Sequence, residues 1–362
     1  MAEMKKKPLQ RCRQSHQEST ALCSGVPQRA LCAEEHVYCP MSTLPLIIIA
    51  GPTGVGKTGM AIEIAELVQG EIVGADSVQI YRYMNIGTAK PTSEEQTRVP
   101  HFMIDIRNPD EEYSAADYVR DATAIIREIH QRGKIPLLVG GTGMYIEKVL
   151  YGIFEGPGRD ETFRQEMQTL ADQQGREAVY HRLQQIDPAT ATRLHPNDLV
   201  RVIRALEVFH LTGVPISVHQ QQATTPVAHY DASFFVLTTE RDALYQRINA
   251  RVDQMMEEGF VEEVQSLHER GYHQDLRPLQ SLGYKEIGEF LTGKTDLESS
   301  VRLIKRNTRH YAKRQLTWFR KYKDVHWIKR DAPQALESIL DHCLGLAAHS
   351  MQNHGSVRAH SG

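Results

Sequence analysis

The clearest chemical signal in the chain is a glycine-rich segment near its start. Residues 51–58 read Gly-Pro-Thr-Gly-Val-Gly-Lys-Thr and match the pattern G-x-x-x-x-G-K-S/T. The backbone N–H groups of such a loop, with the N-terminus of the following helix, form a cradle for phosphate oxygens. The lysine adds a positive charge, and the final threonine hydroxyl can take a Mg²⁺ coordination position. We therefore expect a phosphate site made of Gly51, Pro52, Thr53, Gly54, Val55, Gly56, Lys57 and Thr58.

The carboxylates near this loop do not follow the usual pattern of a nucleotide hydrolase. Such an enzyme has an acid at the end of a later apolar strand, where it supports Mg²⁺. Here the apolar run ending at Val139 continues into Gly140-Gly141-Thr142 without a carboxylate, and the acid at a strand end is Asp76. Because the carboxyl ends of parallel strands meet in one crevice, Asp76 should face the phosphate loop and could act as a general base. The alternative is that Asp76 only forms a turn or caps a helix.

A third signal is the mixture of basic and aromatic residues near the C-terminus. Asp324 is the only acid between residues 301 and 330, and Tyr311, Trp318, Phe319, Tyr322 and Trp327 are interleaved with the basic residues. Basic side chains for phosphates beside aromatic rings that can stack on bases are typical of an RNA-binding surface. The alternative is a solvated helix whose aromatic residues belong to the core, with Ile304, Tyr311 and Trp318 on its buried face. The basic residues are Arg302, Lys305, Arg306, Arg309, Lys313, Arg314, Arg320, Lys321, Lys323, Lys329 and Arg330.

The elements that position these residues alternate along the chain. Short apolar runs at 46–50, 71–75 and 134–139 have the character of strands buried on both faces. Helical patterns at 58–68 and 114–133 separate them. The alternation predicts an α/β fold, a P-loop NTPase-like parallel sheet flanked by helices. The last strand candidate is 234–237, and helices are expected after it at 243–259 and 299–322.

Changes in residue composition and in the apolar pattern divide the chain into four expected regions. Residues 150–225 are rich in Gln and Arg, with helical patterns at 160–174 and 196–211 and no buried strand, which predicts a helical insertion domain. The remaining regions are a disordered N-terminal extension at 1–43, a phosphate-loop core with basic C-terminal helices at 44–149 and 226–335, and a C-terminal helix and tail at 336–362.

Composition narrows the class of protein. At about 150 residues per domain, 362 residues suggest two domains or one large domain with an insertion. The chain is 41% apolar and 24% charged, close to globular averages, and its net charge of −3 gives no reason by itself to expect a nucleic-acid binder. The longest uncharged apolar run, 44–50, is far shorter than the roughly 20 residues of a membrane helix.

Four of the five cysteines lie in the first forty residues without a CxxC pair, and no apolar signal segment precedes the core. We expect a cytoplasmic protein that contacts no membrane and acts as a monomer.

Several motifs occur together in an order that resembles the tRNA dimethylallyltransferases, also called tRNA isopentenyltransferases. The resemblance covers about residues 45–330. The motifs are GPTGVGKT (51–58), DSVQIY (76–81), GTAKP (87–91), VPHFMID (99–105), GGTGMY (140–145), HPND followed by RVIRALEVF (195–209), SLGYKE (281–286) and TRHYAKRQLTWFR (308–320).

The resemblance implies transfer of a dimethylallyl group from dimethylallyl diphosphate to N6 of adenosine 37, the nucleotide 3′ to the anticodon, in tRNAs that read codons beginning with U. The phosphate loop would hold the diphosphate leaving group with Mg²⁺ at Thr58, so no hydrolytic water needs an activating acid. Asp76 corresponds to the family acid that takes or binds the amine proton. Thr142 corresponds to a threonine near the reacting substrates, and Arg251 to an arginine directed at the diphosphate.

The resemblance also implies contacts with the tRNA anticodon loop. The target adenosine would be flipped out of its stack into the protein, beside Asp76, Ser77, Val78 and Gln79. The helical insertion would face the tRNA. Further motif positions expected to face RNA are Arg164, Arg201, Arg204, Tyr284, Lys285, Arg309, Lys313 and Arg314. Any of these arginines could instead form an internal ion pair.

The chain departs from the usual family pattern at several places. Gly54-Val55 stands where the family usually has Ala-Ser, which leaves the backbone cradle intact, and Phe102 replaces the second His of a PHH motif. The extension before the core has no counterpart, and no zinc finger of the eukaryotic relatives follows Arg330. A bacterial-type enzyme is the better match.

Three other functions stay open at this point. A P-loop kinase or NTPase acting on a small molecule would share the loop and sheet, but it would leave the basic C-terminal segment unexplained. Prenyl transfer to free adenine nucleotides would share the core but would not need that segment. A non-catalytic RNA-binding protein with a relic phosphate loop is disfavoured because Lys57, Thr58, Asp76 and Thr142 are all present.

Overall fold

The computed structural model describes residues 44–154, 156–222 and 230–343. The predicted disordered extension, with four of the five cysteines, lies outside these ranges, as does the predicted tail beyond residue 343. None of the helices in the described ranges has the length and apolar character needed to cross a bilayer.

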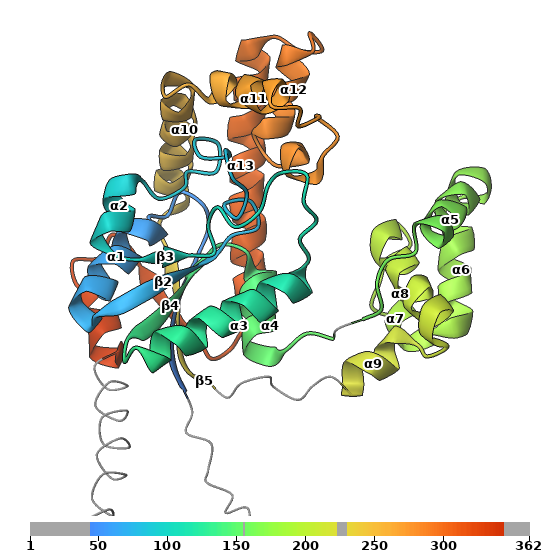
Figure 1. The fold of residues 1–362 in the computed structure, drawn as a ribbon, viewed down its shortest axis with the longest axis horizontal. Helices are drawn as coiled ribbons and strands as arrows, with labels where there is room; N and C mark the ends of the chain where they lie inside the picture. The colour runs from blue at the N-terminus through green and yellow to red at the C-terminus, as the bar shows by residue number, and fades with distance from the viewer. Residues whose placement is uncertain (1–43, 155, 223–229, 344–362) are drawn as a thin grey trace, which may run out of the picture. The chain divides into compact units, whose positions relative to one another are not determined.

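The core is a six-stranded sheet in which every neighbouring pair of strands is parallel (Figure 1). The strand order is β3-β2-β4-β1-β5-β6. This architecture confirms the predicted α/β fold with a parallel sheet. The strands are β1 (Leu44–Ala50), β2 (Gly70–Ala75), β3 (His101–Phe102), β4 (Ile135–Gly140), β5 (Tyr230–Thr238) and β6 (His326–Lys329).

Two of these strands were not expected from the sequence. The strand candidate at 234–237 lies in β5, but it is not the last strand, because β6 pairs with β5 at one edge of the sheet. At the other edge, the two-residue β3 pairs with β2. Phe102 of β3, which replaces the usual family His, lies with its ring 5.7 Å from the guanidinium carbon of Arg132.

The central strand β1 is buried on both faces, which explains its unbroken apolar run. Leu46, Ile48 and Ala50 belong to one apolar core, and Ile47 and Ile49 belong to another on the opposite face. Helix α1 (Lys57–Val68) and residues 335–343 contribute to the second core. Helices α3 (Ala115–Gln131) and α4 (Gly143–Tyr151) contribute to the first. Helices therefore cover both faces of the sheet.

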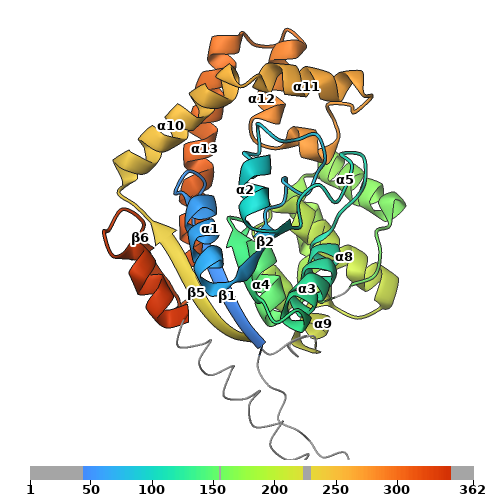
Figure 2. The ribbon, with the colours of Figure 1, turned by 60° about the vertical axis from the view of Figure 1, so that its left-hand side comes forward.

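The chain that follows β5 forms a group of helices (Figure 2). In Figure 2 the arrowhead of β5 points toward α10, which begins three residues after the strand ends. Gln315 and Phe319 are among the buried residues of α13, whereas Tyr311 and Trp318 keep partial exposure, so the predicted buried face was only partly right. The helices of this group are α10 (Arg241–Glu257), α11 (Phe260–Glu269), α12 (Tyr284–Leu291) and α13 (Leu297–Phe319), with a 3₁₀ turn at Arg277–Gln280.

The segment between α4 and β5 is helical throughout its regular elements and has a core of its own. That core joins apolar residues from α5, α6, α7 and α8, including Met167, Val179, Leu183 and Val202. Its buried members all come from this segment, as expected for a unit that packs by itself. The helices are α5 (Glu161–Gln174), α6 (Arg176–Ile186), α7 (Pro188–Ala191), α8 (Leu199–Thr212) and α9 (Ile216–Gln222).

Candidate active site

The phosphate loop joins β1 to α1 and depends on its glycines for its shape. Gly51, Gly54 and Gly56 have φ angles of 148°, 79° and 92°, which L side chains rarely adopt. A Cβ on Gly54 would lie 2.9 Å from Cγ1 of Ile248 on α10, so that helix fits closely against the loop. Glycine at position 54, a departure from the family pattern, therefore fits both the local φ and the space left by Ile248.

Lys57 at the start of α1 carries the charge of the loop. Its ammonium group donates a hydrogen bond to the Pro52 carbonyl oxygen at 3.0 Å. Burial, and secondarily the nearby Arg251 guanidinium, lower the pKa of Lys57 from 10.5 to about 8, while Asp76 opposes this change. A buried cation held without a fully compensating partner favours the binding of an anion.

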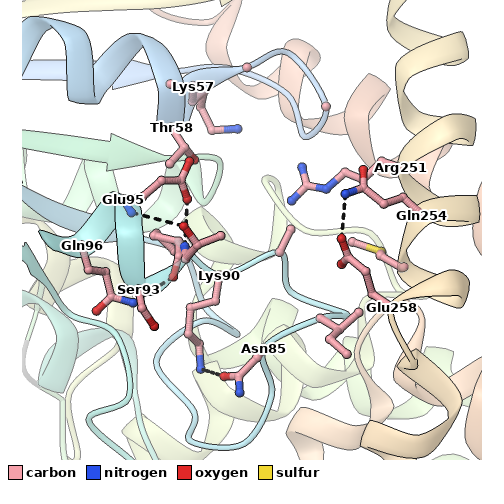
Figure 3. Close-up of a pocket in the computed structure, with 18 of the residues that line it drawn as sticks. Lys57, Thr58, Asn85, Lys90, Ser93, Glu95, Gln96, Arg251, Gln254 and Glu258 are labelled. Carbon is pink, nitrogen blue, oxygen red and sulfur yellow. Dashed lines mark hydrogen bonds between the residues drawn. The ribbon is translucent and has the colours of Figure 1, made fainter. Parts of the chain in front are cut away.

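Two cavities meet at this loop. The first, which we call the phosphate cavity, has a volume of about 640 Å³ and is lined by Lys57 and Thr58 (Figure 3). Figure 3 shows Arg251 and Gln254 of α10 entering it from the side opposite Lys57. Its other polar lining residues are Asn85, Lys90, Thr92, Ser93, Glu95, Gln96, Asp105 and Glu258.

The second cavity, which we call the Asp76 cavity, has a volume of about 350 Å³. Asp76, Ser77, Val78 and Thr53 line it beside residues from α10, α12 and α13. Arg251 and Met255 line both cavities, so the two volumes adjoin at α10. Much of the remaining lining is apolar, from Ile248, Val252, Phe260, Leu282, Tyr284 and Ile304.

Asp76 has two roles in the structure. Its Oδ1 accepts hydrogen bonds from the backbone N–H groups of Val78 at 2.9 Å and Gln79 at 3.3 Å, so part of the capping alternative is correct. The same carboxylate lines the Asp76 cavity. A carboxylate has four lone-pair positions, so this turn leaves capacity for a proton or a donor in the cavity.

Thr142 connects the end of β4 to the loop that carries Asp76. Its hydroxyl accepts a hydrogen bond from the N–H of Ser77 at 3.2 Å, and its own N–H donates to the Ala75 carbonyl at 3.1 Å. Tyr311 of α13 lines the Asp76 cavity. Burial, and then the Asp76 charge, raise the pKa of Tyr311 to about 12, opposed by hydrogen bonding to Thr142. The structure thus brings the predicted Asp76 and Thr142 together.

Arg251 occupies the boundary between the cavities. Burial lowers the pKa of this guanidinium, and the Asp76 charge is the main opposing influence. The group remains cationic because arginine does not deprotonate in proteins. Lys57 therefore lines only the phosphate cavity and Asp76 only the Asp76 cavity, with the positive charge of Arg251 between them.

A loop at residues 85–90 forms a wall of both cavities and is tightly anchored. Both carboxylate oxygens of Glu263 take part in its anchoring, accepting from the N–H groups of Asn85 at 2.8 Å, Ile86 at 2.8 Å and Gly87 at 3.2 Å. The Gln79 amide donates to the carbonyl oxygens of residues 88 and 89, each at 3.1 Å. Gln79, predicted to read the flipped nucleotide, therefore uses its amide N–H groups to hold this wall.

We expect Glu263→Gln to loosen the wall loop. A glutamine presents only one acceptor oxygen, and its NH₂ group would face a backbone donor. Loss of hydrogen bonds to a charged group should lower the free energy of unfolding by about 1.5 to 3 kcal/mol. Amide hydrogen exchange at residues 85–87 should accelerate. The exposed neighbour Glu262→Gln is the control, and equal exchange rates in the two variants would contradict this role of Glu263.

The basic residues of α13 differ in their surroundings. Lys313 and Arg314 are exposed, and Arg314 also lines the Asp76 cavity. Arg309 is half-buried and donates to Oδ1 of Asn249 at 2.6 Å. Lys313 and Arg314 are therefore accessible at the surface, and the Arg314 guanidinium lies 5.7 Å from the centroid of the Tyr311 ring. Arg309 instead connects α13 to α10.

Tyr284 does not have the exposure expected for a residue facing RNA. Its side chain is fully buried, and its hydroxyl donates to the Glu263 carboxylate at 2.6 Å. It supports the wall loop through Glu263 and is one of the residues that line the Asp76 cavity. The adjacent Lys285 is exposed, with Glu289 at 3.9 Å.

Two of the arginines predicted to face RNA hold the helical insertion together. Glu207 of α8 is completely buried and accepts hydrogen bonds from Arg164 at 2.6 and 2.8 Å and from Arg204. Burial alone would raise the pKa of Glu207, but these arginines lower it to about 2. Arg164 and Arg204 thus follow the internal ion-pair alternative. Arg164 joins α5 to α8, whereas Arg204 lies on α8 and also donates to the carbonyl oxygens of Pro157 and Gly158. Arg201 is exposed and pairs with Asp198 at 2.7 Å.

The structure places two further residues beside the phosphate loop and its cavity that the sequence did not assign to this site. Lys90 belongs to the GTAKP motif and lines the phosphate cavity, where it donates to Oδ1 of Asp105 at 2.6 Å. Arg330 lies beside the phosphate loop, since a Cβ on Gly56 would be 3.2 Å from its Nε. The GTAKP motif was the only signal in the sequence for Lys90. Arg330 stood out only as one of the basic residues of the C-terminal segment.

The sequence matches a family model and several known proteins. A family model described as IPP transferase matches residues 79–322. A tRNA dimethylallyltransferase of Geobacter sulfurreducens is 50% identical over 291 residues, which are 80% of this chain and 94% of the relative. A tRNA dimethylallyltransferase 2 of Geotalea uraniireducens is 48% identical over 301 residues, 83% of this chain and 96% of the relative.

Solved structures show the same fold. A full-length tRNA isopentenylpyrophosphate transferase of Bacillus halodurans aligns with a TM-score of 0.64 at 43% identity, covering 86% of this chain and 99% of the other. A eukaryotic dimethylallyltransferase acting on tRNA aligns with a TM-score of 0.71 at 28% identity, covering 86% and 80%. The chain therefore belongs to the tRNA dimethylallyltransferase family, the family whose model is described as IPP transferase.

Proposed function

We propose that this chain transfers a dimethylallyl group from dimethylallyl diphosphate to N6 of adenosine 37 in tRNAs that read codons beginning with U, with release of diphosphate. The observation that carries this proposal is the pair of cavities that adjoin at Arg251. One is polar, contains the phosphate loop and suits a diphosphate. The other is largely apolar, contains Asp76 and suits a hydrocarbon chain beside a nucleobase.

The donor's diphosphate would occupy the phosphate cavity. Gly54, Gly56, Lys57 and Thr58 of the phosphate loop line that space together with Arg251. The Lys57 ammonium, the Arg251 guanidinium and backbone N–H groups of the loop would surround the diphosphate. As the bond between C1 of the dimethylallyl group and the diphosphate oxygen breaks, its electron pair leaves with the oxygen. These fixed positive groups stabilise the charge that grows there.

The residues present fit a Mg²⁺ ion that is held mainly by the substrate. Within the described residues, no three His, Cys, Asp or Glu side chains come together as a metal site. Mg²⁺ commonly binds through substrate phosphates and water with few protein ligands, and the Thr58 hydroxyl lines the phosphate cavity. Thr58 would hold the ion, which would supply further neutralisation of the diphosphate charge.

The acceptor would enter the Asp76 cavity. Its apolar lining can enclose the dimethylallyl group and exclude water, which would otherwise compete as the acceptor. N6 of the adenine forms a bond to C1 of the donor, and the proton that N6 loses passes to the free lone pairs of Asp76. An exocyclic amine is a weak nucleophile, so correct placement of the two reactants should contribute much of the rate.

The tRNA must present adenosine 37 outside its stack to reach this cavity. Arg314 lines the cavity, and Lys313 is exposed beside it in sequence. We propose that these two residues, with Lys285, contact RNA near the cavity. We also propose that the helical insertion, with Arg201 exposed on α8, faces the tRNA.

The contribution of Lys313 and Arg314 predicts a change in salt dependence. If both contact phosphates, replacing both with Gln should reduce the slope of log Kd for tRNA against log salt by about 0.7 to 0.9 per contact removed. Binding of dimethylallyl diphosphate should be nearly constant, because neither residue lines the phosphate cavity.

Arg302→Gln provides the matched control, since it removes one charge from the same helix. Arg302 is paired with Glu298 at 2.7 Å, and its loss should leave the slope for tRNA unchanged. A double variant with a wild-type slope and a lowered Tm would show that Lys313 and Arg314 are structural residues.

Four parallel incubations separate the proposed reaction from its alternatives. The protein is given labelled dimethylallyl diphosphate with unmodified tRNA, with adenosine monophosphate, or with neither, and a parallel sample receives ATP without prenyl donor. We expect label in the tRNA alone. Label in the free nucleotide would indicate prenylation of small molecules, and phosphate release from ATP would indicate an NTPase. The absence of a carboxylate after β4, the strand beside β1, already disfavours the latter.

A further inference from the structure

Gln315 connects three parts of the active site although it lines neither cavity. It lies on α13 with only 6% of its surface exposed. Its side-chain oxygen accepts a hydrogen bond from the N–H of Thr53 in the phosphate loop at 2.9 Å. Its side-chain NH₂ donates to the Gly141 carbonyl after β4, also at 2.9 Å. Both ends of the amide are therefore used, on two different loops.

This arrangement requires the chemistry of an amide. One end must accept from an N–H and the other must donate to a C=O, which neither a carboxylate nor an apolar side chain of the same length can do. A side chain at position 141 would displace this amide, because a Cβ there would lie 2.2 Å from Nε2 of Gln315. The glycine of the GGTGMY motif and the glutamine of α13 thus fit one another.

The two loops that Gln315 joins carry the two halves of the reaction. Thr53 belongs to the phosphate loop and also lines the Asp76 cavity. Gly141 precedes Thr142, whose hydroxyl binds the N–H of Ser77, the residue after Asp76. Hydrogen bonds, together with the peptide bond between Gly141 and Thr142, therefore connect the phosphate loop through Gln315 to the loop that carries the acid. The same helix turn carries Arg314 at the Asp76 cavity.

We propose that Gln315 is a positioning residue that sets the distance between the bound diphosphate and the acceptor amine. This inference rests on the proposed function, because it concerns the alignment of donor and acceptor. Gln315 lines neither cavity, so its loss should affect the step in which both substrates must be aligned. Misplacement of reacting groups by about 1 Å can cost about 100-fold in rate.

The test compares two variants of nearly equal side-chain size. Gln315→Met removes both hydrogen bonds and keeps the volume. It should lower kcat by about 10 to 100-fold, while Kd for tRNA and Kd for an unreactive thiolodiphosphate analogue of the donor stay within about threefold. Gln265→Met, on the exposed surface of α11, is the matched control and should keep the wild-type kcat.

Gln315→Glu supplies a readout that simple packing would not move. The neutral acid has one acceptor oxygen and one O–H donor, as the amide does, whereas the carboxylate can only accept and would repel the Gly141 oxygen. The ratio of kcat for Gln315→Glu to wild-type kcat should therefore rise as the pH is lowered. The same ratio for Gln315→Met should not depend on pH.

Different results would overturn the role of Gln315 and the proposed function. A Gln315→Met variant with kcat within twofold of wild type would overturn the proposal, as would a flat pH dependence of the Gln315→Glu ratio. A fall in kcat fully accounted for by unfolded protein would overturn it too. If the wild-type protein itself transfers no dimethylallyl group, the proposed function has failed. Hydrogen exchange then still tests the contact, since Gln315→Met should accelerate exchange at the Thr53 amide.

Discussion

Replacing Asp76 with Asn should lower kcat for dimethylallyl transfer by about 10² to 10⁴-fold, the usual contribution of a general base. The amide keeps an oxygen that can accept from the N–H groups of Val78 and Gln79, so the local turn should survive. What it loses is the negative charge and the basicity. Kd for tRNA should stay within a few-fold of wild type, and Tm should stay close to it.

Asp76→Ala separates the two roles of this residue. It removes both the base and the turn acceptor, so its kcat should fall as far as that of the Asn variant while its free energy of unfolding falls by about 1 kcal/mol more. Parallel measurements of kcat and Tm on both variants decide the matter. Near-normal turnover in Asp76→Asn would mean that the residue only shapes the loop.

Lys57→Met should be the second large effect. The substitution keeps most of the side-chain volume but removes a cation from the place where the leaving group develops charge. Loss of one such group commonly costs about 10² to 10³-fold in rate. The Kd of the unreactive donor analogue should also rise, because a buried positive charge no longer attracts it.

The lowered pKa of Lys57 predicts proton uptake when the donor binds. In the free protein this pKa is about 8, so the ammonium is half deprotonated near that pH. A bound diphosphate favours the charged form and raises the pKa. Binding at pH 8 should therefore take up about half a proton, and affinity should fall as the pH rises above 8. Below pH 7 the lysine is already charged and uptake should vanish.

Calorimetry of the donor analogue in buffers of different ionisation enthalpy measures this uptake directly. Lys57→Met is the control and should show no uptake assignable to this residue at pH 8. Wild-type binding without proton uptake, or the same uptake in Lys57→Met, would mean that the titrating group is not Lys57.

The sequence could predict the centre of the fold because its signals are local. Strands β1, β2, β4 and β5 are short apolar runs whose burial on both faces makes them visible without any partner. The phosphate loop is defined by eight consecutive residues. Family membership could be recognised for the same reason, since each motif is a continuous segment.

The strands that the sequence did not predict, β3 and β6, form only by pairing with partners that are distant in the chain. β6 reads His326-Trp327-Ile328-Lys329, a pattern with no apolar run, and it becomes a strand only by pairing with β5 at the sheet edge. β3 is too short to leave a periodic signal. Edge strands of this kind cannot be separated from loops by composition alone.

The errors at the candidate site have the same origin. Arg164 has the residue type of an RNA contact, but its partner Glu207 lies on another helix. Arg204 pairs with the same carboxylate three residues along its own helix, and the sequence alone does not show that this carboxylate is buried. Tyr284 is likewise explained by Glu263 on a different helix. Gln315 gave no signal as a glutamine in a basic segment, because its function depends on two loops more than 170 residues earlier in the chain.

The central claim is that the two adjoining cavities hold donor and acceptor of one reaction. The most direct measurement is the ratio of diphosphate released to dimethylallyl groups found at nucleotide 37, with wild-type protein and unmodified tRNA. The account predicts a ratio of one, with no diphosphate released when tRNA is absent or carries guanosine at position 37. Diphosphate release that does not need the tRNA, or a dimethylallyl group attached at another nucleotide, would contradict it.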